Sequence, residues 1–274
     1  MNSLELYKKT VGELQKSGIK SAEIDAQILL EFAARKSREF LLVNQEYQLK
    51  NRKIEELKKL SERRKKHEPI AYITGHKEFF GLDFFVDKNV LIPRPETEQL
   101  VEIALDFLNK KDNKTAAVLD VGTGSGNIII SLAKNASGVF FASDNSAKAL
   151  EVAKKNVAIH NVEINFIQSD LFENILGKFD LIIANLPYVP IDGSFDKEIK
   201  FEPENAIFAK DNGTMIIKRF LIDAKKPINS GGLILVELDP RNADEILVFA
   251  KQLYNSAEII SDFSDQKRIL KVLT

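Results

Sequence analysis

The chain has 274 residues, of which 44% are hydrophobic and 29% charged, and its formal net charge is −1. This length allows one large domain or two smaller ones with sizeable cores. Cysteine is absent and the histidines, His67, His76 and His160, are few and scattered, which excludes disulfides and thiolate nucleophiles and argues against a metal centre. No apolar run approaches the roughly 18 residues of a membrane span, and the N-terminus lacks a secretory pattern. We therefore expect a cytoplasmic protein.

Residues 3–67 have the apolar spacing of successive amphipathic helices, with Ser3 and Ser21 expected as N-caps. In KNRKIEELKKLSERRKK, residues 50–66, the apolar residues recur at helical spacing beneath a basic outer face. That face is either a solvated surface or an electrostatic contact with RNA, or with a partner that sits on RNA. We expect residues 1–75 to form a helical domain.

The aromatic runs on either side of Gly81, in HKEFFGLDFFVDKNV, predict a β-hairpin. We expect this hairpin to occupy the linker 76–93, ahead of a second domain over residues 94–274. In that domain helical patterns alternate with short apolar runs, which predicts an α/β fold with a mainly parallel sheet covered by helices on both faces. The expected strands are 116–121, 139–143, 164–167, 181–184, 233–237, 258–262 and 267–273. In such sheets, ligands bind beyond the carboxyl ends of the strands.

The first of these strands leads into a glycine loop, AVLDVGTGSGN, and the loop leads into a helix. The loop residues are Gly122, Thr123, Gly124, Ser125 and Gly126. Glycines let a ligand approach main-chain N–H groups at a helix N-terminus. The spacing is G-x-G-x-G, which differs from the nicotinamide fingerprint, and the Walker lysine is missing. The loop alone therefore indicates a nucleotide-like ligand without identifying it.

Two acidic strand ends make the ligand more specific. Asp144 ends the second strand about 20 residues past the glycines, where a carboxylate can accept two ribose hydroxyls. The third strand leads to Gln168, Ser169 and Asp170, a polar cluster suited to an adenine amino group. A glycine loop followed by these two acidic ends is typical of the S-adenosyl-L-methionine pocket of class I methyltransferases, which have a Rossmann-like, mainly parallel seven-stranded sheet.

The fourth strand, Leu181 to Ala184, ends in Asn185-Leu186-Pro187-Tyr188. A planar NH₂ group is a poor nucleophile because its lone pair is delocalised, so a methyltransferase must grip its protons and aim its nitrogen. The Asn185 side-chain oxygen and the Leu186 carbonyl can accept those protons, since a residue before proline is held extended. Tyr188 can supply a flat wall. Orientation and preorganised hydrogen bonds would then provide catalysis without a general base.

This segment resembles the Asn-Pro-Pro-Tyr motif of methyltransferases that act on planar amino groups. Together with EPIAYITGHKEFFGLDFFVDKNVLIPRPETE (68–98), QSDLF and FEPENAIFAKDNG (201–213), it resembles the PrmC/HemK family over essentially the whole chain. The resemblance implies an S-adenosyl-L-methionine-dependent enzyme with a small helical substrate-recognition domain at its N-terminus. Such an enzyme methylates the side-chain nitrogen (N5) of the glutamine in the Gly-Gly-Gln motif of class I peptide chain release factors and so modulates translation termination.

The resemblance also assigns residues by motif. The residues implied for the cofactor are Gly122, Thr123, Gly124, Ser125, Gly126, Asp144, Asp170, Leu171 and Asn185. The residues implied for the glutamine and its methylation are Asn185, Leu186, Pro187 and Tyr188, with Arg94, Pro95 and Thr97 lining the pocket and Glu202 and Pro203 buttressing it. Leu186 stands where the family usually has proline, so the fixed φ of proline is lost and a looser, slower site is expected. Leu171 replaces an aromatic residue of some relatives, which would weaken adenine stacking.

Three other functions compete with this interpretation. An adenine-N6 DNA methyltransferase would share the Asn-x-Pro-Tyr chemistry but would normally carry a base-recognition domain and more positive charge. A methyltransferase for RNA or a ribosomal protein, and a non-catalytic S-adenosylmethionine-binding subunit, are the others. We expect a monomer that takes release factors as its protein substrate and forms no stable complex with nucleic acid.

Overall fold

The computed structural model describes residues 1–110, 115–190, 196–209 and 211–274. It divides into two compact units, and the division does not follow the chain order alone. The first unit comprises Met1–His76 together with Asp196–Phe201, and the second comprises Lys77–Phe195 and Glu202–Thr274. Nothing in the sequence pattern predicts that residues 196–201 belong to the first unit. Within the described residues, no helix is long and apolar enough to cross a bilayer.

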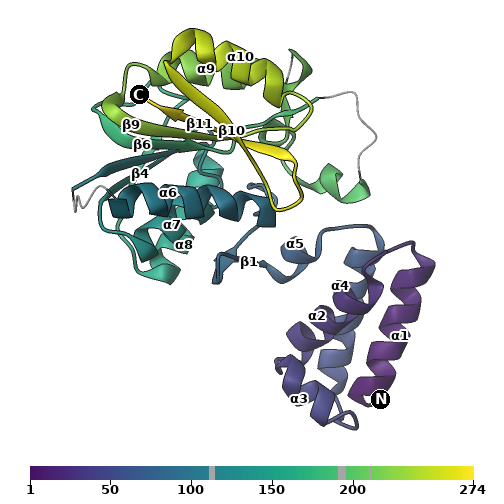
Figure 1. Cartoon of the computed structure of the whole chain (residues 1–274). Coiled ribbons are helices and arrows are strands. Elements are labelled where there is room, and N and C mark those ends of the chain that lie inside the picture. The colour runs from purple at the N-terminus through teal and green to yellow at the C-terminus, as the bar shows by residue number, and fades with distance from the viewer. Residues whose placement is uncertain (111–114, 191–195, 210) are drawn as a thin grey trace. The chain divides into compact units, whose positions relative to one another are not determined.

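The first unit is built from helices around one apolar core (Figure 1). Asn2, and not Ser3, is the N-cap of its first helix, because the Asn2 side chain accepts from the Glu5 N–H while Glu5 accepts from the Asn2 N–H. Ser21 has the N-cap position of the second helix but makes no cap hydrogen bond, since its hydroxyl donates to Asp25. The helices are α1 (Ser3–Lys16), α2 (Ala22–Ala34), α3 (Arg38–Val43), α4 (Asn51–Lys65) and α5 (Ile70–Thr74), with the 3₁₀ turn η2 (Lys197–Phe201).

Helix α4 carries the basic face expected from the sequence. Leu57 and Leu60 are buried beneath it. Several of its cations pair with carboxylates of the same helix or just beyond it, namely Lys53 with Glu56, Lys58 with Glu55, Lys65 with Glu62 and Arg63 with Glu68. The paired carboxylates offset part of the field of these cations, which favours a solvated surface over an RNA contact.

One cation of α4 is different, because Arg64 is only 2% exposed. Its Nε donates to Asp25 Oδ2 over 2.6 Å, and a second guanidinium nitrogen pairs with Glu198 of η2. A third contact runs from Arg64 to the carbonyl oxygen of Glu68 over 3.1 Å. Arg64 therefore joins α2, α4 and the 196–201 segment within the first unit.

The second unit contains the sheet that the alternating pattern predicts. Its seven strands have the order β10-β11-β9-β6-β3-β4-β5, and β11 alone runs antiparallel to its neighbours β9 and β10. The parallel pairs are β6 with β9, β3 with β6, β3 with β4 and β4 with β5. The strands are β3 (Ala117–Val121), β4 (Val139–Asp144), β5 (Asn165–Gln168), β6 (Phe179–Ala184), β9 (Ile228–Glu237), β10 (Ser256–Ser261) and β11 (Lys267–Leu273). The expected α/β, mainly parallel, seven-stranded fold is confirmed.

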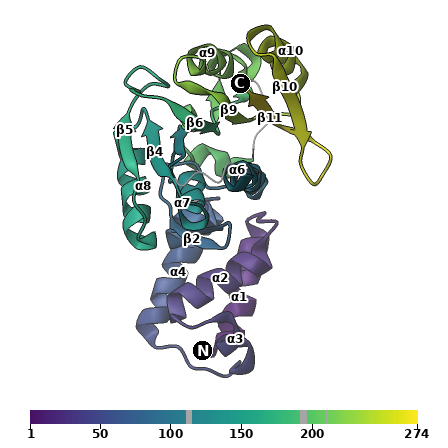
Figure 2. The same ribbon diagram turned by 60° about the vertical axis from the view of Figure 1, so that its left-hand side comes forward.

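Helices cover both faces of this sheet, as Figures 1 and 2 show. One apolar core joins the sheet to α9 and α10, and another joins it to α6 and α7. The helices of this unit are α6 (Glu98–Lys110), α7 (Asn127–Asn135), α8 (Ala147–His160), α9 (Met215–Ala224) and α10 (Ala243–Leu253). Strands β3, β4, β5, β6 and β9 run parallel, so their carboxyl ends lie at one edge of the sheet.

Two short pairs of strands complete the second unit. The strands expected around Gly81 are β1 (His76–Phe79) and β2 (Leu82–Phe85), which form a separate two-stranded sheet. Beyond β6, β7 (Val189–Pro190) pairs in parallel with β8 (Phe208–Ala209). The short 3₁₀ turns are η1 (Pro95–Thr97), η3 (Glu204–Ala206) and η4 (Asp211–Gly213). Lys210, within the motif 201–213, lies outside the described residues.

Candidate active site

A cavity of about 290 Å³ opens in the second unit, lined by residues at the carboxyl ends of β3, β4, β5 and β6. It brings together most of the residues singled out from the sequence. The lining includes Arg94, Thr97, Gly122, Thr123, Gly124, Ser125, Asp144, Asp170, Leu171, Asn185, Leu186, Pro187 and Pro203. Pro95, Gly126 and Tyr188 are not among the lining residues: Pro95 begins the turn 95–97, Gly126 is the N-cap of α7, and the Tyr188 hydroxyl donates to Glu237. The glycine loop and the Asn-x-Pro-Tyr segment thus share one cavity.

The glycine loop and the Asn-x-Pro-Tyr segment are packed against each other. Gly122 has φ +76°, in the left-handed region that suits glycine, and a Cβ atom there would lie 3.0 Å from Leu186 Cδ2. Leu186 itself is only 5% exposed and belongs to a core cluster with Val121 and Ala184. Packing therefore holds Leu186 in the position where the Asn-Pro-Pro-Tyr motif has a conformationally fixed proline.

Asp144 extends from the end of β4 toward the glycine loop. Its Oδ2 accepts the Gly124 N–H over 3.0 Å and its Oδ1 accepts the Ser146 N–H over 2.9 Å. Burial raises the pKa of this carboxyl, and the backbone N–H groups oppose the rise. Each oxygen keeps a second lone pair, so the carboxylate can both order the loop and accept hydroxyls from a ligand.

Two lining residues beside β5 have unexpected geometry. The Asp170 carboxylate is engaged by Arg219 over 2.9 Å, in an ion pair with 45% and 44% of the two side chains exposed. Leu171 has φ +46°, an uncommon conformation for a leucine, while its side chain is 4% exposed. The turn after β5 is therefore stabilised by the exposed Asp170–Arg219 ion pair and by the buried side chain of Leu171.

The LIPRPETE segment is tied to the FEPEN segment by one buried carboxylate. Glu202, 5% exposed, accepts from Arg94 through Oε1 and from the Ile92 N–H through Oε2 over 3.1 Å. Both segments contribute to the cavity lining, through Arg94 and Pro203. Glu202 thus supports the cavity wall without itself lining it.

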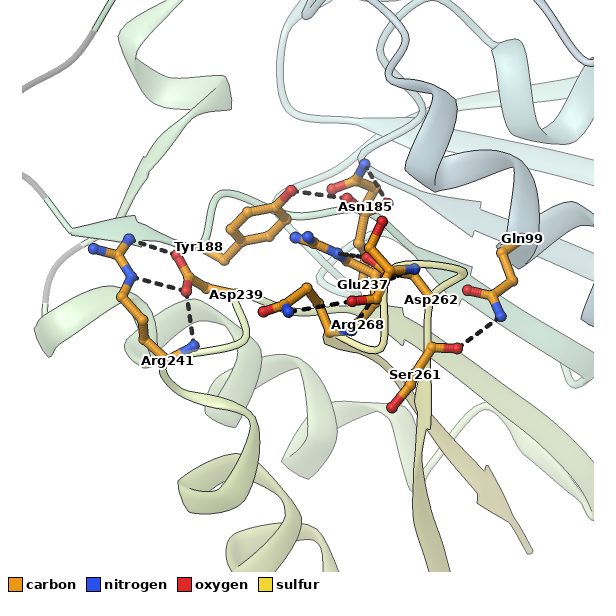
Figure 3. A network of polar contacts seen from close by, with 11 residues as sticks. Gln99, Asn185, Tyr188, Glu237, Asp239, Arg241, Ser261, Asp262 and Arg268 are labelled. Carbon is orange, nitrogen blue, oxygen red and sulfur yellow. Dashed lines mark hydrogen bonds and ion pairs between the residues drawn. The ribbon is translucent and has the colours of Figure 1, made fainter.

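The Asn185 side chain lies in a polar network shown in Figure 3. Its Nδ2 donates to Thr97 Oγ1 over 3.1 Å and to Glu237 Oε2 over 3.0 Å, and the Tyr188 hydroxyl donates to Glu237 Oε1 over 2.8 Å. Burial raises the pKa of Glu237, while hydrogen bonds from Thr97 and Tyr188 and the charge of Arg268 oppose the rise. Burial and Glu237 together raise the pKa of Tyr188 well above its usual value, which keeps this hydroxyl a donor.

Sequence reasoning missed two buried carboxyls, Glu237 and Asp120. Both are acidic residues near the carboxyl ends of aliphatic strands, and that contrast is the one feature that could have identified them. Asp120 is fully buried; its Oδ2 accepts from the Thr123 hydroxyl over 2.7 Å, whereas no hydrogen bond to its Oδ1 is found among the described residues. Burial raises the pKa of Asp120 from 3.8 to about 7.

We predict that Asp120 makes the stability of the ligand-free protein fall as pH rises from 4 to 7. In this range the folded protein retains a proton that the unfolded chain has released, so folding takes up a proton and each rise in pH disfavours it. The slope from this group is at most about 1.4 kcal/mol per pH unit, and its total is about 4 kcal/mol. Urea unfolding between pH 5 and 8 should therefore show a shallower decline for Asp120→Asn than for the natural protein. Exposed Asp106→Asn is the matched control, and equal slopes for all three proteins would contradict the prediction.

Two family models match the chain. The PrmC N-terminal domain matches residues 5–75, and the methyltransferase small domain matches residues 99–200. Solved structures support the same fold at low sequence identity. A methyltransferase from Pyrococcus furiosus covers 72% of this chain and 91% of its own, with 18% identity and a TM-score of 0.55. A 16S rRNA N2-G1207 methyltransferase of T. thermophilus, solved with AdoMet and guanosine, covers 73% and 49%, with 15% identity and a TM-score of 0.54.

Curated relatives match nearly the whole chain. A "Bifunctional methyltransferase" of Rickettsia bellii is 36% identical over 95% of this chain and 52% of its own length, so the chain spans about half of that relative. The release factor glutamine methyltransferase of Haemophilus influenzae is 32% identical over 98% of both chains. That of Deinococcus radiodurans is 30% identical over 99% of this chain and 98% of its own. The chain therefore belongs to the release factor glutamine methyltransferase family.

Proposed function

We propose that this chain transfers a methyl group from S-adenosyl-L-methionine to the side-chain amide nitrogen of the glutamine in the Gly-Gly-Gln motif of class I release factors. The observation that carries the proposal is the shared cavity, in which the glycine loop and Asp144 lie with Asn185, Leu186 and Pro187. A site for a nucleoside-like methyl donor and a site for a planar amide are thus adjacent. The names of the full-length relatives support the choice of release factors as substrate.

The residues at the glycine loop suit S-adenosyl-L-methionine. Gly122 lets a ligand approach the main chain, and Asp144 has free lone pairs for hydroxyls. Asp120 supports the same loop from below, because its carboxylate accepts from the Thr123 hydroxyl. When bound, the cofactor supplies an electrophilic methyl group on a sulfonium sulfur.

The residues after β6 suit an amide acceptor. The amide nitrogen is a weak nucleophile, so the chain must hold its two protons and direct the nitrogen. Asn185 Oδ1 and the Leu186 carbonyl are the acceptors for those protons, and both residues line the cavity. Leu186 precedes proline and is buried, so its carbonyl is held by the extended backbone and by packing. Acceptors fixed in advance lower the barrier because nothing has to reorganise during transfer.

Several features argue against an RNA substrate, although a solved rRNA methyltransferase shares the fold. The cations of α4 are largely paired with carboxylates, and the chain as a whole has a net charge of −1. Neutralising an RNA backbone favours a clear basic excess. We therefore propose a protein substrate and no stable complex with nucleic acid. We also propose a cytoplasmic location and a monomeric enzyme.

Mass spectrometry of a release factor tests this function. The purified chain, S-adenosyl-L-methionine and a class I release factor are incubated, and a factor with Gln→Ala in its Gly-Gly-Gln motif serves as the matched control. We expect one added methyl group on the glutamine of the natural factor and none on the variant. A native factor that remains unmethylated while the cofactor binds would overturn the proposed substrate.

Asp144 provides a test of the cofactor pocket. We expect Asp144→Ala to weaken S-adenosyl-L-methionine binding by about 2–4 kcal/mol, because hydrogen bonds to a charged group are lost. Asp144→Asn keeps one acceptor oxygen and should lose less. Isothermal titration calorimetry measures both, with Asp106→Asn as an exposed control. Affinity unchanged in the alanine variant would remove Asp144 from the pocket.

A further inference from the structure

Glu237 lies at the carboxyl end of β9, which is next to β6 in the sheet. The parallel register pairs Ala184, the last residue of β6, with Val236. Asn185 follows Ala184 and Glu237 follows Val236, so the two residues are adjacent across the strands. Glu237 is only 1% exposed. A buried carboxyl is costly unless hydrogen bonds satisfy it, so its presence here needs a reason. Neither the sequence pattern nor the family resemblance assigned it a role.

The hydrogen bonds of Glu237 determine which end of the Asn185 amide faces it. An ionised carboxylate only accepts hydrogen bonds, so the NH₂ end of Asn185 must point to Glu237 and the oxygen must point away. The reverse orientation would bring Asn185 Oδ1 against a negatively charged oxygen. Thr97 reinforces the choice, because its hydroxyl donates to Glu237 and so can only accept from Nδ2. Figure 3 shows the Asn185 and Tyr188 side chains gathered at Glu237.

We propose that Glu237 is a positioning residue that fixes the amide of Asn185 with its oxygen available to the acceptor glutamine. The inference rests on the proposed function of the site. Without this constraint the two ends of an asparagine amide have nearly the same shape, and the flipped form would present NH₂ to the substrate NH₂. Two donors facing each other cannot form the hydrogen bond that holds the acceptor nitrogen.

The same carboxylate also locates Tyr188. Its Oε1 accepts from the Tyr188 hydroxyl while its Oε2 accepts from Asn185. One buried group therefore fixes both the amide and the ring of the Asn-x-Pro-Tyr segment. Burial opposes the ionised form of Glu237, while the hydrogen bonds from Thr97 and Tyr188 and the charge of Arg268 favour it. Arg268 in turn donates to Asp262 over 3.2 Å, which keeps its guanidinium at this end of the sheet.

Two replacements of Glu237 separate positioning from mere support of the fold. Glu237→Gln keeps the size but has one acceptor oxygen and one NH₂ group, so it can pair with either end of the Asn185 amide and no longer fixes its orientation. Glu237→Asp is shorter but remains a two-oxygen acceptor. If Glu237 positions Asn185, kcat should fall about 10- to 100-fold in the glutamine variant, which is less than the loss expected for Asn185→Ala. The aspartate variant should then be more active than the glutamine variant. A purely structural role predicts the opposite order, because aspartate leaves a cavity and glutamine does not.

A double-mutant cycle provides a second test of the proposal. If Glu237 acts through Asn185, then Glu237→Gln should cause little further loss of kcat in an Asn185→Ala background. A multiplicative loss, or a glutamine variant as active as the natural enzyme, would overturn the proposal. Equal affinity for S-adenosyl-L-methionine and equal thermal stability serve as controls for correct folding.

A readout independent of turnover distinguishes failure of this inference from failure of the proposed function. Side-chain ¹⁵N-asparagine NMR, assigned with Asn185→Asp, follows the Asn185 NH₂ protons. We expect a downfield, exchange-protected proton in the natural protein and in Glu237→Asp, and its loss in Glu237→Gln. If the release factor is not methylated, the proposed function fails while this spectrum still decides the orientation. An unchanged spectrum in Glu237→Gln would overturn the inference.

Discussion

Replacing Asn185 with alanine should lower turnover about 10²–10³-fold, by analogy with the removal of one preorganised hydrogen-bonding group from an active site. Asn185 Oδ1 is one of the two acceptors that hold the substrate NH₂ group, and its loss leaves the acceptor nitrogen poorly aimed. Affinity for S-adenosyl-L-methionine should change little, because Asp144 and the glycine loop remain. Single-turnover methylation of a release factor measures the first effect and calorimetry the second.

Asn205→Ala is the matched control for this prediction. Asn205 also lines the cavity, yet it has no place in the proposed grip on the amide. Its turnover should stay within a few-fold of the natural value. Asn185→Ala also removes a donor from buried Glu237, so its thermal unfolding must be measured to exclude loss of fold. A folded Asn185→Ala variant with nearly full turnover would reject the amide-gripping role.

Replacing Arg64 with methionine should destabilise the first unit by about 3–5 kcal/mol, because removing one partner of a buried ion pair leaves an uncompensated charge. The charge in question is Asp25, whose side chain is 4% exposed and lies 2.6 Å from Arg64 Nε. Methionine fills much of the volume, so the expected loss is electrostatic more than steric. Urea unfolding, followed by far-ultraviolet circular dichroism, measures the change.

Arg63→Met is the neighbouring control, since Arg63 is 44% exposed in its pair with Glu68 and should cost less than about 1 kcal/mol. The double replacement Arg64→Met with Asp25→Leu should recover part of the stability, because an apolar pair can replace a buried ion pair at little cost. If Arg64→Met proved no worse than Arg63→Met, the buried pair would contribute nothing to folding.

The sequence predicted the order and type of elements in the second unit because alternating helical and apolar patterns are local. The sequence also predicted that Asn185 lies close to the glycine loop, because parallel strands place their carboxyl ends at one edge of the sheet. The N-cap of α1 was wrong by one residue, as Asn2 and Ser3 are both good capping types and only the capping hydrogen bonds distinguish them. Ser3 instead donates to the carbonyls of Asn44 and Gln45.

The missed features depend on long-range pairing. Glu237 meets Asn185 across 52 residues of sequence, through a strand order that the hydrophobic pattern does not specify. Asp120 stands out only once its burial is known, because an acidic residue near a strand end is also common at the surface. The burial of Leu186 against the position of Gly122 is likewise a tertiary contact that the sequence does not show, and the expectation of a looser, slower site stays a prediction.

The membership of 196–201 in the first unit has a consequence for biosynthesis. Glu198 follows Arg64 by 134 residues, so the ribosome adds most of the second unit before the guanidinium meets its second carboxylate. The helical bundle can form early, but its ion pair with Glu198 forms only after β6 and Asn185 have been made. A fragment that stops at residue 76 would consequently lack part of its own unit, and a nascent chain would complete its first unit only when much of the second has been made.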